Sequence, residues 1–172
     1  MTHPMDAPHQ SGHLAELTRL LWTQRELIGE LEFRLEVQQL VMTNGKHERL
    51  HLAVADVEGV LDRIRVLEEH RLGVVAECAV ELGLPVGASL QQLIDAAPEP
   101  WKYALSDHQT ELLRIVARTE DLASSNRGIA TRTVDENRHA FEAMGVTPVT
   151  AYGRHGDRPH LELPPTLVDR EA

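Results

Sequence analysis

Three residues near the start of a predicted long helix have the types and spacing of a zinc-peptidase site. His47, Glu48 and His51 form the pattern of two histidines one helical turn apart, with a glutamate directly after the first. On a helix this spacing places both imidazoles on one face as zinc ligands, and the glutamate would activate a water molecule as a base.

A catalytic zinc ion also needs a third protein ligand, and the sequence offers none within reach. No Gly or His follows at the offsets of the extended metzincin motif. Glu68 and Glu69 would lie on the same predicted helix, about 25 Å away at roughly 1.5 Å per residue. The chain has ten histidines, so a chance match is unsurprising. We therefore expect no enzyme activity, no catalytic residue, no metal and no cofactor, with a zinc peptidase as the remote alternative.

The charge and cysteine content disfavour several kinds of partner and site. The 172 residues include 17 Lys and Arg against 27 Asp and Glu, which gives a formal net charge of −10. This balance disfavours nucleic acid and anionic membrane surfaces, because both are bound largely through Lys and Arg. Cys78 is the only cysteine, so neither an intramolecular disulfide nor a multi-cysteine metal site can form. No run of about 18 apolar residues and no apolar signal core occurs, so we expect a cytosolic protein.

Apolar residues at alternating spacings of three and four predict two long helices with heptad seams, a seam being the row of residues that faces a partner helix. The first helix is expected from about His13, capped by Ser11, and its seam contains Leu14, Leu17, Leu21, Ile28, Leu31, Leu35 and Met42, with Gln24 and Gln38 at the two remaining positions. The second is expected from about Lys46, and its seam contains Leu50, Val54, Val57, Leu61, Ile64, Val75, Cys78 and Leu82, interrupted by Glu68 and Arg71. The connection over 43–46 is short, so these helices should form an antiparallel hairpin.

Two further helices complete the predicted fold. Ser89 and Gln92 have capping-box spacing and should open a short helix that ends near Ala97. A last long helix should run from about Trp101 to Met144. The predicted fold is all-α, an antiparallel bundle or hairpin of three long helices with coiled-coil-like packing and one short helix. We expect a flexible arm over 1–12, a helical domain over 13–145 and a disordered tail over 146–172.

The second half of the last helix has too thin an apolar stripe to bury itself firmly, so we expect a partner helix to cover it. The candidate binding residues are Leu122, Asn126, Ile129, Ala130, Val134, Asn137 and Phe141. Polar residues should set the register where helices meet: Gln24, Gln38, Asn126 and Asn137. Glu68 and Arg71 are either a further register pair or a helical pair that reaches water at the seam edge.

The order of several short motifs resembles the FlgN-type flagellar export chaperones over about residues 13–156. After the Asn44-Gly45 turn these are Leu67-Glu68-Glu69-His70-Arg71, Leu82-Gly83-Leu84-Pro85, Ala88-Ser89-Leu90-Gln91-Gln92-Leu93, Ala97-Pro98-Glu99-Pro100-Trp101, Asn126-Arg127 and Ala151-Tyr152-Gly153-Arg154-His155-Gly156. The resemblance implies a chaperone that binds helical terminal segments of hook-associated filament-junction proteins. It also implies delivery of these clients to the cytosolic domain of the flagellar export gate, with both contacts made by the C-terminal region.

Tyr152 is the only aromatic residue in the expected tail, which makes it the candidate anchor for the export gate. The tail after Gly156 and the His-rich N-terminus have no counterpart in the resemblance. The sequence leaves open the identity of the client and whether the chain pairs with a second copy. A structural coiled-coil scaffold is the alternative function, although a scaffold should keep its seam to the last heptad, whereas this seam fades after Ala123.

Overall fold

The computed structural model describes residues 7–144, which contain four α-helices, one 3-10 turn and no β-strand. The elements are α1 (Ala7–Thr43), η1 (His47–Arg49), α2 (Leu50–Glu81), α3 (Leu90–Ala96) and α4 (Trp101–Ala143). The predicted all-α fold of three long helices and one short helix is confirmed. The chain divides into two compact units, residues 1–126 and residues 127–172, and the boundary falls inside α4 directly after Asn126.

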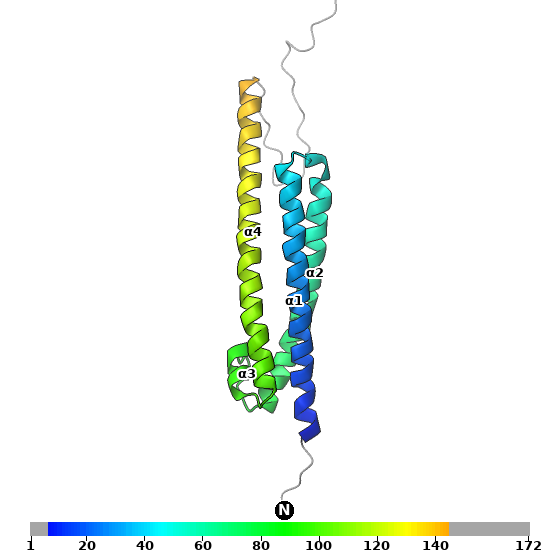
Figure 1. The fold of residues 1–172 in the computed structure, drawn as a ribbon, viewed down its shortest axis with the longest axis vertical. Helices are drawn as coiled ribbons and strands as arrows, with labels where there is room; N and C mark the ends of the chain where they lie inside the picture. Colours follow the sequence, from blue (N-terminus) through cyan, green and yellow to red (C-terminus); the bar gives the residue numbers. More distant parts are fainter. Residues whose placement is uncertain (1–6, 145–172) are drawn as a thin grey trace, which may run out of the picture. The chain divides into compact units, whose positions relative to one another are not determined.

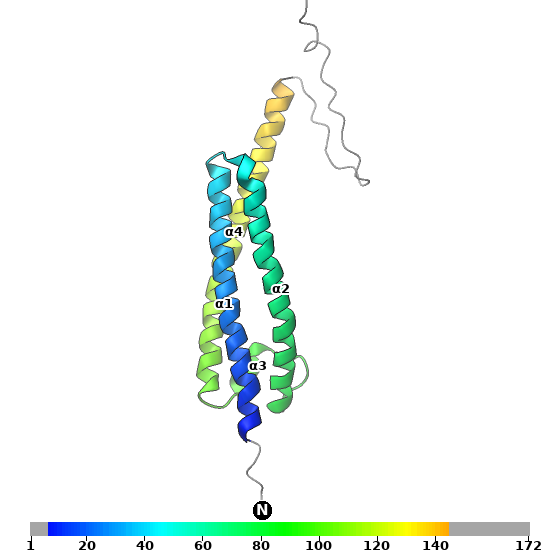
Figure 2. The same cartoon turned by 90° about the vertical axis from the view of Figure 1, so that its right-hand side faces the viewer.

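A tight turn reverses the chain between α1 and α2, so that the two helices form the predicted antiparallel hairpin (Figures 1 and 2). Gly45 has a φ of 67°, which a side chain would strain. The Gly45 N–H donates to the Met42 carbonyl and the Lys46 N–H donates to the Val41 carbonyl, at 3.3 and 3.1 Å. This pair of bonds is a Schellman motif, which satisfies carbonyls that the end of α1 would otherwise leave unpaired.

The end of α2 and the start of α3 are also fixed by local hydrogen bonds. At Gly83, with a φ of 68°, a second Schellman motif ends α2, since the Leu84 N–H donates to the Ala79 carbonyl at 2.8 Å. Ser89 then caps α3: its hydroxyl accepts from the Gln92 N–H, and the Gln92 side chain accepts from the Ser89 N–H. The predicted capping box is therefore confirmed.

Within residues 7–126, α1 lies beside both α2 and the first part of α4 (Figures 1 and 2). All seven apolar residues of the predicted α1 seam are buried, at 9% exposure or less. Leu20 and Leu27 are buried as well, although they lie outside that seam. The buried face of α1 is wider than one seam because two helices cover it.

The most deeply buried row of α2 is rotated slightly from the predicted seam, most of whose residues still pack against the core. Ala53, Val60 and Val74 are buried, whereas their predicted neighbours Val54, Leu61 and Val75 are only half-buried. The buried row and the predicted row have four residues in common: Val57, Ile64, Arg71 and Cys78. These four continue a spacing of three and four residues with either row. Apolar residues at three positions of each heptad allow two overlapping seams, and the more deeply buried one has the smaller side chains.

The start of α1 also differs from the prediction. The helix begins at Ala7 instead of near His13, so Ser11 lies inside the helix and does not cap it. Pro8 falls in the first turn, where a missing N–H and a fixed φ are tolerated. The remainder of the expected arm and the expected tail over 146–172 lie outside the described residues.

Candidate functional site

The zinc-like motif does not form a metal site in the described part of the chain. His47 and Glu48 belong to the 3-10 turn η1, whereas His51 lies in the first turn of α2. All three side chains are exposed. Among residues 7–144, no three His, Cys, Asp or Glu side chains lie close enough together to hold a metal ion.

Polar side chains cross from α1 to α2 at the seam position that breaks the apolar row. Arg71 donates two hydrogen bonds to Glu68 Oε2, at 2.7 and 3.0 Å, and Gln24 of α1 donates to the other oxygen of Glu68. The Glu68–Arg71 pair is therefore tied to α1 and does not simply point into water. This contact supports the interpretation as a register pair.

His13 of α1 lies between two carboxylates near the end of α2. Its Nδ1 contacts Glu81, and its Nε2 lies 3.4 Å from Glu77. The hydrogen bond with Glu81 raises the pKa of His13 above its ordinary value, and the negative charges of both glutamates act in the same direction. Cys78 next to them is fully buried, and burial together with these glutamates raises the pKa of its thiol to about 11. Cys78 is thus a packed, protonated core residue, in agreement with its predicted place in the seam.

The first part of α4 carries its own regular seam. Spacings of three and four connect the buried or half-buried residues Leu105, His108, Leu112, Ile115, Thr119, Leu122 and Asn126. His108 is 7% exposed, and its Nδ1 lies 3.2 Å from the Arg25 guanidinium of α1. Burial, and then the charge of Arg25, lowers the pKa of His108. The ring is therefore neutral near pH 7, with Nδ1 as the acceptor for Arg25.

Asn126 closes this seam with hydrogen bonds to α1. Its side-chain amide donates to the Leu35 carbonyl at 2.8 Å and to Gln38 Oε1 at 3.1 Å. The predicted register role of Asn126 and Gln38 is thus supported by a contact between the two helices. Asn137, the other predicted register residue of α4, is exposed and has no side-chain hydrogen bond among the described residues.

The seven residues predicted to bind a partner fall into two sets on α4. Leu122 and Asn126 belong to the packed seam, and Ile129 continues its spacing and is half-buried. The other four form a neighbouring row, which we call the outer stripe: Ala130, Val134, Asn137 and Phe141. All four are exposed, including 57% of Val134 and 44% of Phe141. Tyr152, the predicted anchor, lies outside the described residues.

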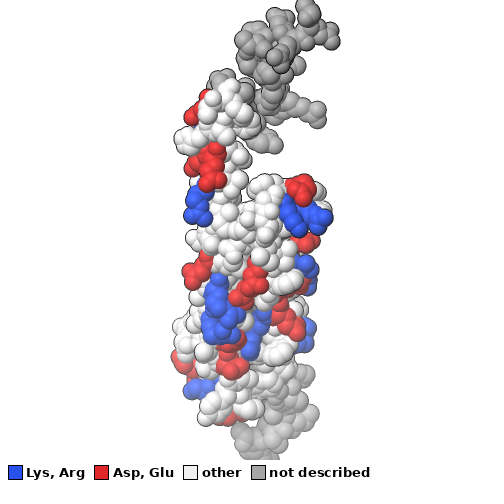
Figure 3. Space-filling model, turned by 45° about the horizontal axis from the view of Figure 1, so that its top comes forward, with Lys and Arg blue, Asp and Glu red and all other residues white. Residues whose placement is uncertain are grey.

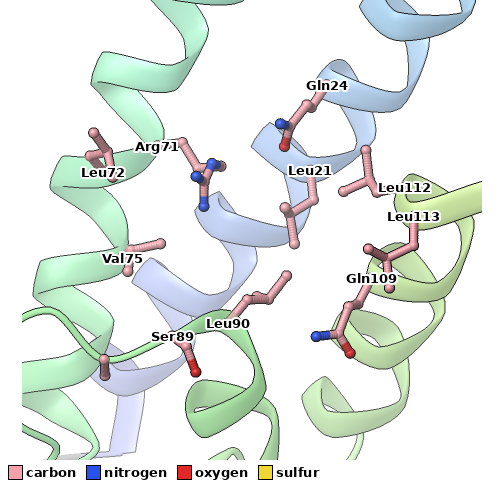
Figure 4. Close-up of a pocket in the computed structure, with 11 residues that line it drawn as sticks. Leu21, Gln24, Arg71, Leu72, Val75, Ser89, Leu90, Gln109, Leu112 and Leu113 are labelled. Atoms are coloured by element: carbon pink, nitrogen blue, oxygen red, sulfur yellow. The ribbon is translucent and has the colours of Figure 1, made fainter. Parts of the chain in front are cut away.

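An open groove of about 410 Å³ lies between α2 and α4, with α1 as its floor and the start of α3 at one side (Figure 4). We call it the α2–α4 groove. The larger apolar residues that line it are Leu21, Leu72, Val75, Leu90, Leu112 and Leu113. Gln24, Gln109 and Arg71 are its main polar residues, and Arg71 points from α2 toward α1. Sequence reasoning missed this groove, although Leu72, an apolar residue of α2 outside the predicted seam, was a signal for it.

The surface has no single basic patch on the face shown in Figure 3, where acidic and basic side chains are interspersed. Ion pairs join the helices, such as Arg118 with Glu32 at 2.9 Å and Arg63 with Glu30 at 2.8 Å. None of the described helices is both long enough and apolar enough to cross a membrane.

Long helices packed along heptad seams, with an exposed stripe and an open groove, are typical of helical proteins that bind other proteins. A family model described as FlgN protein matches residues 5–160. The chain therefore belongs to the FlgN family, the flagellar export chaperone family, and the predicted resemblance is confirmed. Comparisons with curated proteins and with solved structures found no match.

Proposed function

We propose that this protein is a cytosolic, non-catalytic chaperone that binds helical terminal segments of hook-associated filament-junction proteins and delivers them to the flagellar export gate. Membership of the family supports the general role in flagellar export. The observation that supports a client site is the outer stripe of α4, whose four side chains are all exposed.

The outer stripe has the spacing that a partner helix requires. Ala130, Val134, Asn137 and Phe141 follow one another at four, three and four residues, so they share one face of α4. A helix laid along this face would bury Val134 and Phe141, the two largest apolar side chains of the row. Burial of such side chains is worth about 1.5 to 3 kcal/mol each, which is enough for two anchors to dominate a helical interface.

Two matched substitutions test the client site. Val134→Asp and Phe141→Asp place a charge on the outer stripe, and both positions are exposed, so the melting temperature should hardly change. Binding of the client should be abolished, because a partner helix would have to bury the new carboxylate. His139→Asp is the control, since His139 is exposed and its spacing places it on the opposite face of the same helix. The measurement is calorimetric titration with purified filament-junction proteins from the same cells.

Hydrogen exchange tests the same proposal without a mutation. Amides over 124–144 should exchange fast in the free protein and become protected when the client is added. Ile129→Asp should also lower client binding, but it should cost some stability because Ile129 is half-buried. Full protection of 124–144 in the free monomer, or normal client binding by Val134→Asp and Phe141→Asp, would move the client site elsewhere.

Docking at the export gate is a separate part of the proposal and depends on Tyr152. Tyr152→Ala should weaken binding to the purified cytosolic domain of the gate and leave the affinity for the client unchanged, because the aromatic ring is the proposed anchor. Surface plasmon resonance with the gate domain immobilised measures the first effect. Equal gate binding by both forms would exclude Tyr152 as the anchor.

A further inference from the structure

We propose that one face of α1 pairs with the same face of a second copy of the chain, with the two α1 helices antiparallel. We call this face the α1 outer row, and its charged and large apolar members, all of them exposed, are Arg19, Trp22, Glu26, Phe33, Glu36 and Leu40. Ala15, which is also exposed, extends the row at its start, and the half-buried Gly29 lies near its middle. This pairing involves the chain alone and does not depend on the proposed function.

The α1 outer row has the spacing of a coiled-coil seam. From Ala15 to Leu40 its positions follow one another at alternating steps of four and three residues, so they share one side of α1 over about 38 Å. Trp22, Phe33 and Leu40 are 54%, 55% and 60% exposed, and they are the only large apolar side chains that α1 exposes within residues 12–43. None of the three belongs to the buried clusters of the described core. Exposed apolar side chains gathered in one such row indicate a helical partner.

Both aromatic rings of the row are held in place by neighbouring side chains. The guanidinium of Arg25 lies 5.3 Å from the centre of the Trp22 ring, and that of Arg34 lies 5.7 Å from the centre of the Phe33 ring. The Trp22 ring also contacts the ring of His108 in a T-shaped arrangement, with 6.2 Å between their centres. Rings that are already held lose little conformational freedom on binding, which suits them as the anchors of an interface.

One antiparallel register brings unlike charges together and pairs the two aromatic residues. When Trp22 lies opposite Phe33 of the second copy, Arg19 lies opposite Glu36 of that copy, and the two-fold axis repeats both pairs. The side chain of Arg19 is 61% exposed and bonds Glu16 through Nε and Nη2, so its Nη1 keeps donors for Glu36. At the centre of this register Glu26 lies opposite a glycine, Gly29, which leaves its carboxylate room to reach water.

Other arrangements of the same row bring like charges or unlike side chains together. A shift of the antiparallel register by one heptad places Glu26 opposite Glu36 at two points, and the shift in the other direction places Trp22 opposite Glu26. A parallel pair would set Arg19, Glu26 and Glu36 each opposite its own copy. Like charges that face each other across a helix pair are destabilising. The charge pattern of the row therefore favours an antiparallel second copy as its occupant.

Sedimentation equilibrium of the full chain tests this pairing. The unchanged chain should form a dimer with a Kd in the micromolar range, because a single pair of helices makes a narrow interface. Phe33→Ser should weaken the dimer about 100-fold, since each anchor contributes about 10-fold and the dimer contains two copies of it. Tyr103→Ser is the matched control, because Tyr103 is 73% exposed on α4 and lies outside the row. Both variants change exposed side chains, so their melting temperatures should stay close to that of the unchanged chain.

A charge swap tests the register. Arg19→Glu alone, or Glu36→Arg alone, sets like charges opposite each other at two points and should weaken the dimer about 10-fold or more. The double variant, with both substitutions in one chain, should recover the affinity of the unchanged chain, because each new glutamate then faces a new arginine. Additive losses in the double variant would show that these residues do not face each other, and would overturn the proposed register.

Disulfide trapping tests the antiparallel orientation, since this register places Ala15 opposite Leu40 of the second copy. An oxidised equimolar mixture of Ala15→Cys and Leu40→Cys chains should give a cross-linked dimer. Either variant alone should stay uncross-linked, because equal positions lie about 37 Å apart in this arrangement. The native Cys78 is fully buried and does not compete for the new thiols.

The outcomes that would overturn the pairing do not involve a client. They are a chain that remains monomeric at about 1 mM, a dimer that Phe33→Ser leaves unchanged, and a disulfide between equal positions. If the chain is monomeric and Phe33→Ser instead abolishes client binding, the row belongs to the client site and the pairing is wrong, while the proposed function stands.

Discussion

Val60 and Leu61 are neighbours on α2, and each belongs to a different one of the two possible seams of this helix. The choice of seam therefore decides which of the two side chains is more deeply buried. Val60 is 3% exposed and packs with Leu31 and Leu35 of α1, whereas Leu61 is half-buried at the edge of the same cluster. Val60→Asp should therefore destabilise the protein far more than Leu61→Asp. The seam predicted from the sequence alone would give the reverse order.

The expected free-energy loss follows from the charge and from the lost apolar burial. At pH 7 a buried aspartate can bind a proton and become neutral. The free-energy cost of its charge is therefore at most about 4.2 kcal/mol, which is 1.36 kcal/mol for each unit between the ordinary aspartate pKa of about 3.9 and pH 7. Loss of the buried valine surface adds about 1.5 kcal/mol or more. We expect a total of about 4 to 6 kcal/mol for Val60→Asp. For Leu61→Asp we expect about 1 to 2 kcal/mol, because the carboxylate at a half-buried position still reaches water.

Urea unfolding followed by circular dichroism measures both variants against the unchanged protein. The pH dependence separates a buried charge from a general packing defect. Burial raises the pKa of the aspartate introduced at position 60 in the folded state, so the stability of Val60→Asp is highest below about pH 3.9 and falls as the pH rises through that raised pKa. Lowering the pH from 7 to 5 should recover about 2.7 kcal/mol relative to the unchanged protein. Leu61→Asp should show little change over this range.

The assay also works if Val60→Asp is unfolded at pH 7, because it can then be compared with Leu61→Asp at pH 5. A larger loss for Leu61→Asp than for Val60→Asp at the same pH would refute the observed seam. Equal losses that do not depend on pH would show that neither side chain is buried as described.

Two further predictions concern histidines. NMR titration should place the pKa of His13 above 6.5 and that of His108 below it. The stability that His13 contributes is therefore complete below pH 6.5 and is lost as the pH rises through its folded pKa, and His13→Gln should remove this loss. The stability that His108 contributes is present above pH 6.5 and is lost as the pH falls toward its folded pKa. A reversed order of the two pKa values would contradict the contacts of both rings. His47→Ala and His51→Ala should leave the fold and client binding intact, because both side chains are exposed; one tightly bound zinc ion per chain, found by elemental analysis and lost in both variants, would instead support the peptidase alternative.

The sequence by itself determined the elements whose cause is local. The Gly45 and Gly83 turns, the Ser89–Gln92 capping box and the start of α4 after Pro100 were all predictable, because these features depend on hydrogen bonds and dihedral angles within a few residues. The α1 seam was also predictable, since its apolar residues repeat at heptad spacing, although the burial of Leu20 and Leu27 beside it was not. Family motifs spread over the chain predicted membership of the FlgN family in the same way.

Only the tertiary structure decided which of several apolar rows each helix buries. On α2 the sequence allowed a seam through Leu61 or through Val60, and the choice depended on how closely α1 could approach. On α4 the tertiary structure placed Asn126 in a seam that is hydrogen-bonded to α1 and Val134 in an exposed row. Periodicity identifies the faces of a helix that can be buried, but the partners available to each face determine which one is, and those partners are distant in sequence.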